Sequence, residues 1–455
     1  MRRILYFLVS LIVVSNLNIF ISGCGTIGAP TGGKRDSIPP KLINAIPLNG
    51  TRNFTGKKIT LYFDEYVQLV EKEQNILVSP TPKTPANIDY KLRTVTIKLR
   101  DSLEPNTTYL INMGNSIRDL NEGNILRNFS YVFSTGAYID SLEYSGQVKL
   151  AETGKLDTSL IVMLYKNLAD SAVQKQKPNY IARLDGGGNF TFHNLAAGTY
   201  KVYALQDLSN SRVYNDKKEL FAFLSSPVLV KNKTKSDTLL AYVELKPQEK
   251  ATAAEKKLKF TTRITTESQD LLSSLEIIFN KPLKNFDIGK VILADTLNHT
   301  DVAAVITIDS TRKRITVSKS WKENESYKLI LSKAITDTAG NTLVKSDTLR
   351  FKTKKEEDYG SLTINFTNIA SVVNPVLVIV GGTGISYFPI TSTKWSRKLF
   401  IPGEYEIRIL SDLNKNNTWD PGNFALKRQP EKVFSVPKKI SVRGGGWENE
   451  FDVSL

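Results

Sequence analysis

Oxygen-bearing side chains recur at every second position near the C-terminal end of the chain. They are Asp412, Asn414 and Asn416, and Asp420 follows after a short interval. Calcium takes about six to eight oxygen ligands, and a loop that offers alternate side chains can wrap around one ion. Two carboxylates are few for tight binding, however, and no glutamate closes the site. The segment therefore predicts either a Ca²⁺ site or a polar loop whose side chains are satisfied in Asx turns.

Other residue types that carry out chemistry are sparse. The two histidines, His193 and His299, lie far apart, and strand alternation places His193 opposite Phe190 and Phe192. We expect both histidines to be surface residues. The chain contains no Gly-x-Ser-x-Gly elbow, no His-Glu-x-x-His pair and no phosphate-binding loop. The sequence therefore predicts no catalytic residue, although a pair of loop carboxylates of the glycosidase kind stays an alternative.

The only cysteine, Cys24, follows a short apolar run that begins behind Arg2 and Arg3. A positive start, an apolar stretch over residues 4–14 and small residues before the cysteine are typical of a secretory signal. Polar residues interrupt the run before it reaches the roughly 20 apolar residues that a membrane-spanning helix needs. A plain signal peptide and a membrane anchor are therefore the weaker alternatives.

This arrangement resembles the lipobox of bacterial lipoproteins, with Ile21 in its aliphatic position. The resemblance implies a signal peptide over residues 1–23 and acylation of Cys24, which would anchor the protein in a membrane. Gly25 replaces the aspartate that retains many such lipoproteins at the inner membrane, so we expect the outer membrane. Because no acidic cluster follows Cys24, the periplasmic face of that membrane is favoured over the cell surface.

The formal charge of +16 falls to +14 when Arg2 and Arg3 leave with the signal peptide. This excess favours anionic neighbours, or serves only solubility. For a secreted lipoprotein we expect an anionic glycan or envelope proteins as partners, besides the membrane, and no nucleic acid. With Cys24 acylated, no thiol is left for a disulfide, thiol catalysis or a metal. Apart from the Ca²⁺ candidate, the sequence predicts no cofactor.

Behind a predicted flexible tether over residues 24–38, apolar and polar residues alternate along most of the chain. Clusters of Asn, Asp, Gly and Pro break the alternation about every eight to twelve residues, which is typical of β-sandwiches. Strand candidates in the first part are residues 60–63, 94–99 and 131–133. Helical periodicity is almost absent. The pattern predicts an all-β chain, a tandem array of β-sandwich modules.

A first signature occurs twice. An Ile-x-Asp turn ending in Gly-Asn, over residues 117–124 and 335–341, precedes a Phe-x-Thr strand end at 133–135 and 351–353. These residues resemble the S-layer-type bacterial Ig-like domain. The resemblance covers about residues 39–136 and, in a more divergent copy, residues 259–354.

A second signature also occurs twice, over residues 195–207 and 400–412, as a Gly-x-Tyr strand that ends at an aspartate. It resembles the transthyretin-like or carboxypeptidase-regulatory-like sandwich and implies two further modules. We call the four predicted modules A1, B1, A2 and B2. Their ranges are 39–136 for A1, 138–245 for B1, 259–354 for A2 and 359–455 for B2, with a linker over residues 246–258.

Together these resemblances imply a non-enzymatic cell-envelope lipoprotein, anchored in the outer membrane, that acts as an Ig-like scaffold or binding protein. One alternative is a glycan-binding accessory lipoprotein, which would need Trp395, Trp419 and Trp447 to cluster at the surface over a basic face. A second alternative is an envelope hydrolase, which would need two loop carboxylates about 5 to 10 Å apart in a cleft.

Overall fold

Almost all regular structure in the chain is β-strand. The computed structural model describes residues 35–455 except 233, 246–256, 263, 265–267, 297–299 and 383. The predicted signal peptide, Cys24, most of the tether, most of the linker and His299 lie outside the described residues. Within them, the α-helices are the four-residue α2 (Lys72–Asn75) and α3 (Ala172–Lys175). The all-β prediction is therefore confirmed.

Among the described residues, no helix combines the length and the apolar character that crossing a membrane requires.

The chain divides into two compact units, residues 1–139 and residues 140–455. The first unit contains module A1, and the second contains B1, A2 and B2. The finer boundaries inside the second unit stay a prediction.

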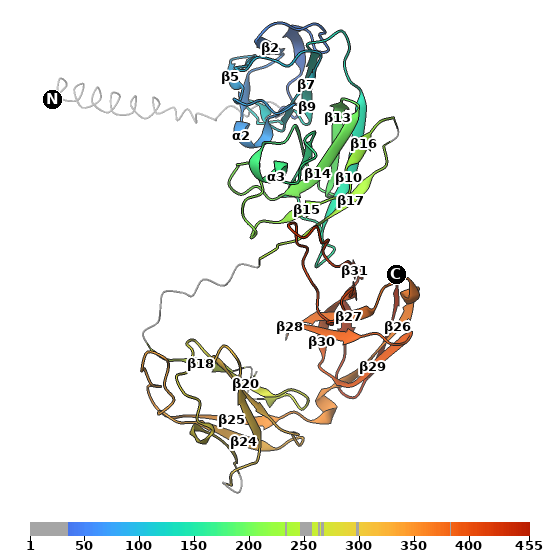
Figure 1. Ribbon diagram of the computed structural model, residues 1–455. Coiled ribbons are helices and arrows are strands. Elements are labelled where there is room, and N and C mark those ends of the chain that lie inside the picture. Colours follow the sequence, from blue (N-terminus) through green and yellow to red (C-terminus); the bar gives the residue numbers. More distant parts are fainter. Residues whose placement is uncertain are drawn as a thin grey trace, which may run out of the picture. The chain divides into compact units, whose positions relative to one another are not determined.

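Module A1 contains two main sheets with strand orders β1-β2-β6-β5 and β4-β7-β9, and a short ribbon of β3 and β8 (Figure 1). Its strands are β1 (Leu42–Ile46), β2 (Lys58–Phe63), β3 (Val67–Leu69), β4 (Leu77–Ser79), β5 (Asn87–Lys91), β6 (Thr94–Lys98), β7 (Thr108–Gly114), β8 (Ile117–Asp119) and β9 (Phe129–Ser134). The predicted strands at 60–63, 94–99 and 131–133 correspond to β2, β6 and β9.

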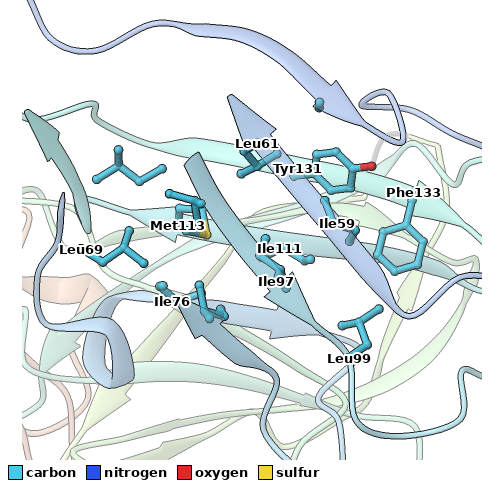
Figure 2. Close-up of a cluster of buried hydrophobic side chains, with 14 of the residues drawn as sticks. Ile59, Leu61, Leu69, Ile76, Ile97, Leu99, Ile111, Met113, Tyr131 and Phe133 are labelled. Carbon is cyan, nitrogen blue, oxygen red and sulfur yellow. The ribbon is translucent and has the colours of Figure 1, made fainter. Parts of the chain in front are cut away.

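The core of A1 lies between these two sheets. Strand β2 alternates buried and part-exposed residues, so that Ile59 and Leu61 point inward, and Ile97 of β6 does the same. Figure 2 shows these side chains in one interior with Ile111 of β7 and Phe133 of β9. The ring of Phe133 stacks on Tyr109 with 5.2 Å between ring centroids. Alternation along each strand therefore builds this core.

Module B1 contains one sheet ordered β13-β10-β17 and a second ordered β12-β11-β14-β15, in which β16 also pairs with β14 (Figure 1). Its strands are β10 (Leu142–Leu150), β11 (Ile161–Tyr165), β12 (Tyr180–Arg183), β13 (Asn189–Leu195), β14 (Gly198–Leu205), β15 (Phe221–Phe223), β16 (Val228–Val230) and β17 (Asp237–Ala241). The first and last strands, β10 and β17, run parallel. Residues from both sheets share one buried core.

Module A2 repeats the strand order of A1. Its sheets are β18-β20-β23-β22 and β19-β25-β24-β21, and strand β19 pairs parallel to β25. Its strands are β18 (Phe260–Thr262), β19 (Ser268–Gln269), β20 (Leu275–Phe279), β21 (Val291–Asp295), β22 (Val305–Ile308), β23 (Arg314–Ser318), β24 (Ser326–Leu331) and β25 (Asp347–Thr353), with the 3₁₀ turn η2 (Ile288–Lys290). In A1, an isolated parallel bridge between Thr51 and Phe133 takes the place of the β19–β25 pair.

Module B2 repeats the strand order of B1. Its sheets are β29-β26-β33 and β28-β27-β30-β31, with β32 also paired to β30, and its first and last strands are again parallel. Its strands are β26 (Gly360–Thr367), β27 (Pro375–Gly381), β28 (Gly384–Pro389), β29 (Lys394–Phe400), β30 (Gly403–Ser411), β31 (Val433–Ser435), β32 (Ile440–Val442) and β33 (Glu448–Ser454), with the 3₁₀ turn η4 (Ile369–Ser371); the 3₁₀ turn η3 (Glu356–Asp358) comes directly before the module. The paired modules thus share topology as well as sequence signatures.

Candidate functional site

The predicted calcium segment forms the loop between β30 and β31. Its first residue, Asp412, is buried, and both of its carboxylate oxygens accept hydrogen bonds from the loop backbone. Oδ1 accepts from the Lys415 N–H at 2.7 Å, and Oδ2 accepts from the Asn417 N–H at 2.7 Å. Lys415 and Asn417 both have left-handed backbone, with φ of 64° and 59°. The aspartate therefore holds a tight turn through Asx-type hydrogen bonds.

The remaining predicted ligands lie together on the exposed side of the same loop. The side-chain amides of Asn414 and Asn416 both donate to Oδ2 of Asp420, at 2.8 and 2.7 Å. The amide oxygens of Asn414 and Asn416 accept from the backbone N–H groups of Asn416 and Thr418. In this arrangement amide nitrogens, rather than oxygens, face the carboxylate of Asp420. Across the described ranges, no group of three or more His, Cys, Asp or Glu side chains is placed to hold a metal, and calcium stays a prediction.

Sequence reasoning missed a buried glutamate at this loop. Glu431, only 4% exposed, accepts from the Leu413 N–H at 2.7 Å and from the Asp420 N–H at 3.0 Å. Burial raises its pKa, two N–H donors partly offset this, and the carboxylates of Asp412 and Asp420 raise it further. The expectation that no glutamate closes this loop is therefore wrong, because Glu431 contacts both of its ends in the folded chain.

Module B1 contains the signal that would have identified this glutamate. There, buried Glu219 accepts from the Leu208 N–H at 3.2 Å, just as Glu431 accepts from Leu413. In both B modules an Asp-Leu pair ends the Gly-x-Tyr strand and a buried glutamate precedes the next strand. The two glutamates lie at different distances from Asp207 and Asp412, but each comes two residues before the next strand, so an alignment based on that strand pairs them.

The tryptophans of the glycan-binding alternative do not gather at the surface. Trp395 is part-buried and packs against Phe388 beside the core of B2, with 5.0 Å between ring centroids. Trp419 is part-buried, and its Nε1 donates to the Glu431 carbonyl at 3.0 Å. Of the three, Trp447 is exposed, at 58%, and the guanidinium of Arg443 lies over its ring. Of the three tryptophans that the glycan-binding alternative needs, one is therefore exposed and two are part-buried against hydrophobic clusters.

His193 lies on the exposed side of β13, as the alternation predicts. Its Nδ1 is 2.6 Å from Oε1 of Glu143 on the neighbouring strand β10, and both side chains are exposed. An open depression of about 340 Å³ next to this pair is lined by Ser141, Leu142, Glu143, Ser145, Lys231, Asn232 and Thr234. Glu143 is the single carboxylate in that lining, so the depression does not contain the carboxylate pair that the hydrolase alternative needs.

The aspartates of the first repeated signature are buried structural residues. Asp119 accepts from the N–H groups of Glu122 at 2.6 Å, Gly123 at 2.9 Å and Asn124 at 2.5 Å. In A2, Asp337 accepts from the Ala339 N–H at 2.9 Å and from the backbone and side chain of Asn341, each at 2.8 Å. The Gly-Asn ending of the signature therefore supplies the turn that wraps around each carboxylate.

The closing threonines of the signature also have structural partners. The Thr135 hydroxyl accepts from the Thr107 N–H and donates to the Glu104 carbonyl, at 2.9 and 2.7 Å. The Thr353 hydroxyl accepts from Glu325 N–H and donates to the Lys322 carbonyl, at 2.9 and 2.5 Å. Each threonine thus connects the end of the module's last strand, by hydrogen bonds, to the turn before the strand that contains Tyr109 or Tyr327.

The tyrosines of the second signature close a corner of each B module. The Tyr200 hydroxyl donates to the Ala196 carbonyl at 2.9 Å, and the Tyr405 hydroxyl donates to the Ile401 carbonyl at 2.8 Å. In each module the glycine of the Gly-x-Tyr sequence lies between the two bonded residues. The tyrosine ring lies over that glycine. The arrangement is similar to the tyrosine corner of β-sandwiches.

Comparison with known proteins identifies the A modules. Residues 36–135 and 260–353 match the family model described as Bacterial Ig-like domain. The search of curated proteins gives no match. These two matched ranges lie within a few residues of the predicted modules A1 and A2.

Several solved structures are similar to parts of the chain. They include the major pilin subunit BcpA of Bacillus cereus, at 9% identity over 69% of this chain and 99% of that chain, with a TM-score of 0.19. The S-layer protein SbsC matches at 11% identity over 91% and 54%, and a biofilm-associated protein at 10% over 91% and 99%, both with TM-scores of 0.16. Because these TM-scores are far below 0.5, they establish no shared global fold. Residues 36–135 and 260–353 of the chain are thus similar to the bacterial Ig-like domain.

Proposed function

We propose that the protein is a non-enzymatic lipoprotein of the cell envelope, anchored in the outer membrane, in which Ig-like domains serve as a scaffold or binding surface. The observation that carries the proposal is that the residues of the first repeated signature stabilise the fold. Asp119 and Asp337 are buried and accept several N–H donors each, so the residues that recur in the A modules serve the fold. Domains of this kind act through their surfaces.

The proposed anchor rests on Cys24 and the segment before it. A positive start, a short apolar stretch and small residues before a single cysteine together fit an acylated N-terminus. One acyl chain alone gives marginal membrane binding, so stable attachment needs the additional chains that lipoprotein processing would add. The cysteine would then have a covalent role and no catalytic one.

The proposed partners are an anionic glycan or other envelope proteins, because the mature chain would carry a charge of +14 after loss of Arg2 and Arg3 from the formal +16. Such an excess raises the local concentration of anionic partners and is screened by salt. Binding that depends on this charge would weaken as ionic strength rises.

Protease accessibility on intact cells tests the proposed location. The periplasmic placement predicts that the native protein resists added protease until the outer membrane is permeabilised. The Cys24→Ala variant is the control, and it should appear in the soluble periplasmic fraction. Cleavage of the native protein on intact cells would contradict the periplasmic face and direct the search for partners to the outside of the cell.

A further inference from the structure

One sheet of module B1 is apolar on both of its faces. Toward the sandwich core, strands β11 and β14 present Val162, Leu164, Val202 and Ala204. On the opposite face, Met163, Tyr165, Tyr203, Leu205, Phe221 and Phe223 are equally buried, in a separate cluster. The outer face of a sandwich sheet is ordinarily polar because it meets water. Something in the chain must therefore cover this face.

Part of the cover comes from B1 itself, where Tyr214 stacks on Phe221 with 3.9 Å between ring centroids, and part from the β30–β31 loop of module B2. Phe424, 7% exposed, lies against the outer face of B1 with its ring centroid 5.2 Å from that of Phe221 and 5.3 Å from that of Phe223. Its centroid is also 5.8 Å from that of Tyr203. The part-buried ring of Trp419 belongs both to this cluster and to the one on the outer face of B2's own sheet. One loop thus contacts the apolar faces of two sheets.

The backbone of the loop approaches B1 as closely as the rings do. A Cβ built on Gly422 would lie 2.4 Å from the Tyr242 ring, so only glycine fits at that position. The Gln429 side chain donates to the Phe223 carbonyl at 2.9 Å and to the Ser225 hydroxyl at 3.1 Å. These polar bonds fix the orientation of the loop against the edge strand β15.

A second contact region adds a largely buried ion pair. Arg408, 6% exposed, donates through Nε to Glu406 at 2.8 Å and through Nη1 to the Glu152 carbonyl of B1 at 3.2 Å. Lys155 of B1 contacts the other oxygen of Glu406 at 2.9 Å. The Ser435 hydroxyl also donates to the Thr153 carbonyl. A buried arginine is costly unless it is fully paired, and here its partners come from both modules.

We propose that B1 and B2 of one chain dock onto each other as a single body, that the β30–β31 loop is the docking element, and that module A2 is carried as an insertion between them. The loop's Trp-Asp-Pro-Gly sequence then has a role that requires no ligand. The shorter β14–β15 loop of B1 lacks these residues, and its Tyr214 is part of the receiving face. Glu431 and Asp412 shape the loop so that Trp419 and Phe424 project from it.

Disulfide trapping tests this arrangement, because Cys24 is the only cysteine of the chain. A Cβ built on Gly154 of B1 would lie 3.4 Å from the Ser435 Cβ of B2, close to the separation of about 3.5 to 4.5 Å in disulfides. We would introduce Gly154→Cys and Ser435→Cys in the full chain with Cys24→Ser, and a protease site within residues 246–256. After oxidation and cleavage, the fragments should stay together until they are reduced.

Two controls make the result specific. The pair Gly154→Cys and Gly382→Cys should not cross-link, since nothing lies within 4 Å of a Cβ at Gly382. Adding Phe424→Ala to the trapping pair should lower the cross-linked yield severalfold, whereas Leu426→Ala, at a 73% exposed position of the same loop, should leave it unchanged.

Two outcomes would overturn the proposal. Because Gly154 has a φ of 66°, the doubly substituted chain must first be shown to melt at the temperature of the native chain. Failure of that folded variant to cross-link under oxidation would show that the modules do not dock. Cross-linking exclusively between chains, seen as a disulfide-linked dimer, would show that the loop of one copy docks on B1 of another.

Discussion

At the scale of single residues, the most consequential side chains are buried carboxylates that accept backbone N–H groups. Asp337 is fully buried and holds the turn before the last strand of A2, with the Lys281 ammonium 3.4 Å away. Burial raises the pKa of Asp337, but hydrogen bonds from Asn341, Lys281 and Ala339 outweigh it, and the pKa is lowered overall. The ionised form is therefore the one that stabilises the fold.

Replacing this carboxylate should destabilise A2. Asp337→Ala leaves buried N–H donors without an acceptor, and we expect a loss of about 3 kcal/mol in the free energy of unfolding. Calorimetric unfolding of the full chain measures the change. Asp301→Ala, at an exposed position of the same module, is the matched control and should be near neutral. Equal effects of the two substitutions would contradict the assigned role.

The same residue makes stability depend on pH. Its folded pKa is below the unfolded value of about 3.9, so the stabilisation is present above that value and is lost as the pH falls through the folded pKa. Asp119 in A1 behaves in the same way, because hydrogen bonds outweigh its burial. We expect the melting temperatures of the A modules to decrease when the pH is lowered below about 4. In Asp337→Asn, the acid-induced fall of A2 should be smaller than in the native chain.

Tyr200 and Tyr203 lie on the same strand, β14, and together they measure how much a buried hydroxyl contributes to the free energy of unfolding. The Tyr200 hydroxyl donates to a carbonyl, whereas the buried Tyr203 hydroxyl has no hydrogen-bond partner within the described residues. Tyr200→Phe should cost about 1 kcal/mol, and Tyr203→Phe should be neutral or stabilising. Chemical denaturation of the two variants measures the difference, and a larger loss for Tyr203→Phe would refute the assignment.

At the scale of elements, the sequence predicts the strands well because one residue in two must face a core. Ile59 and Leu61 in β2 follow this rule, and the predicted strand lies inside the observed one.

The outer face of B1 was not predicted, although unbroken apolar runs such as residues 161–165 and 202–205 indicate burial on both sides of a sheet. Glu431 was missed because its partners lie many residues away. Local sequence patterns therefore do not reveal contacts between residues that are far apart in the chain.

The β30–β31 loop is the element whose predicted chemistry can be measured directly. Because the Asp412 carboxylate already accepts backbone N–H groups and the Asp420 carboxylate accepts the side-chain amides of Asn414 and Asn416, we expect the melting temperature of the protein to be the same with Ca²⁺ and with a chelator. A rise of several degrees with Ca²⁺ that disappears in Asp420→Asn would instead establish the calcium site of Asp412, Asn414, Asn416 and Asp420.

At the scale of the whole molecule, the account joins two matched Ig-like domains, two further sandwich modules and a proposed acylated N-terminus. The family match covers residues 36–135 and 260–353, and the strand orders of the B modules repeat as closely as those of the A modules. A repeated array of sandwiches offers a large surface for partners. Anchoring at one end would hold that surface at the membrane.

The measurement that tests this account most directly is metabolic labelling with radioactive palmitate, followed by fractionation of the cell envelope. The account predicts that the native protein takes up label and sediments with the outer membrane. Cys24→Ala should take up no label and should leave the membrane fraction. An unlabelled native protein, or a variant that stays labelled and membrane-bound, would contradict the anchor on which the proposed function depends.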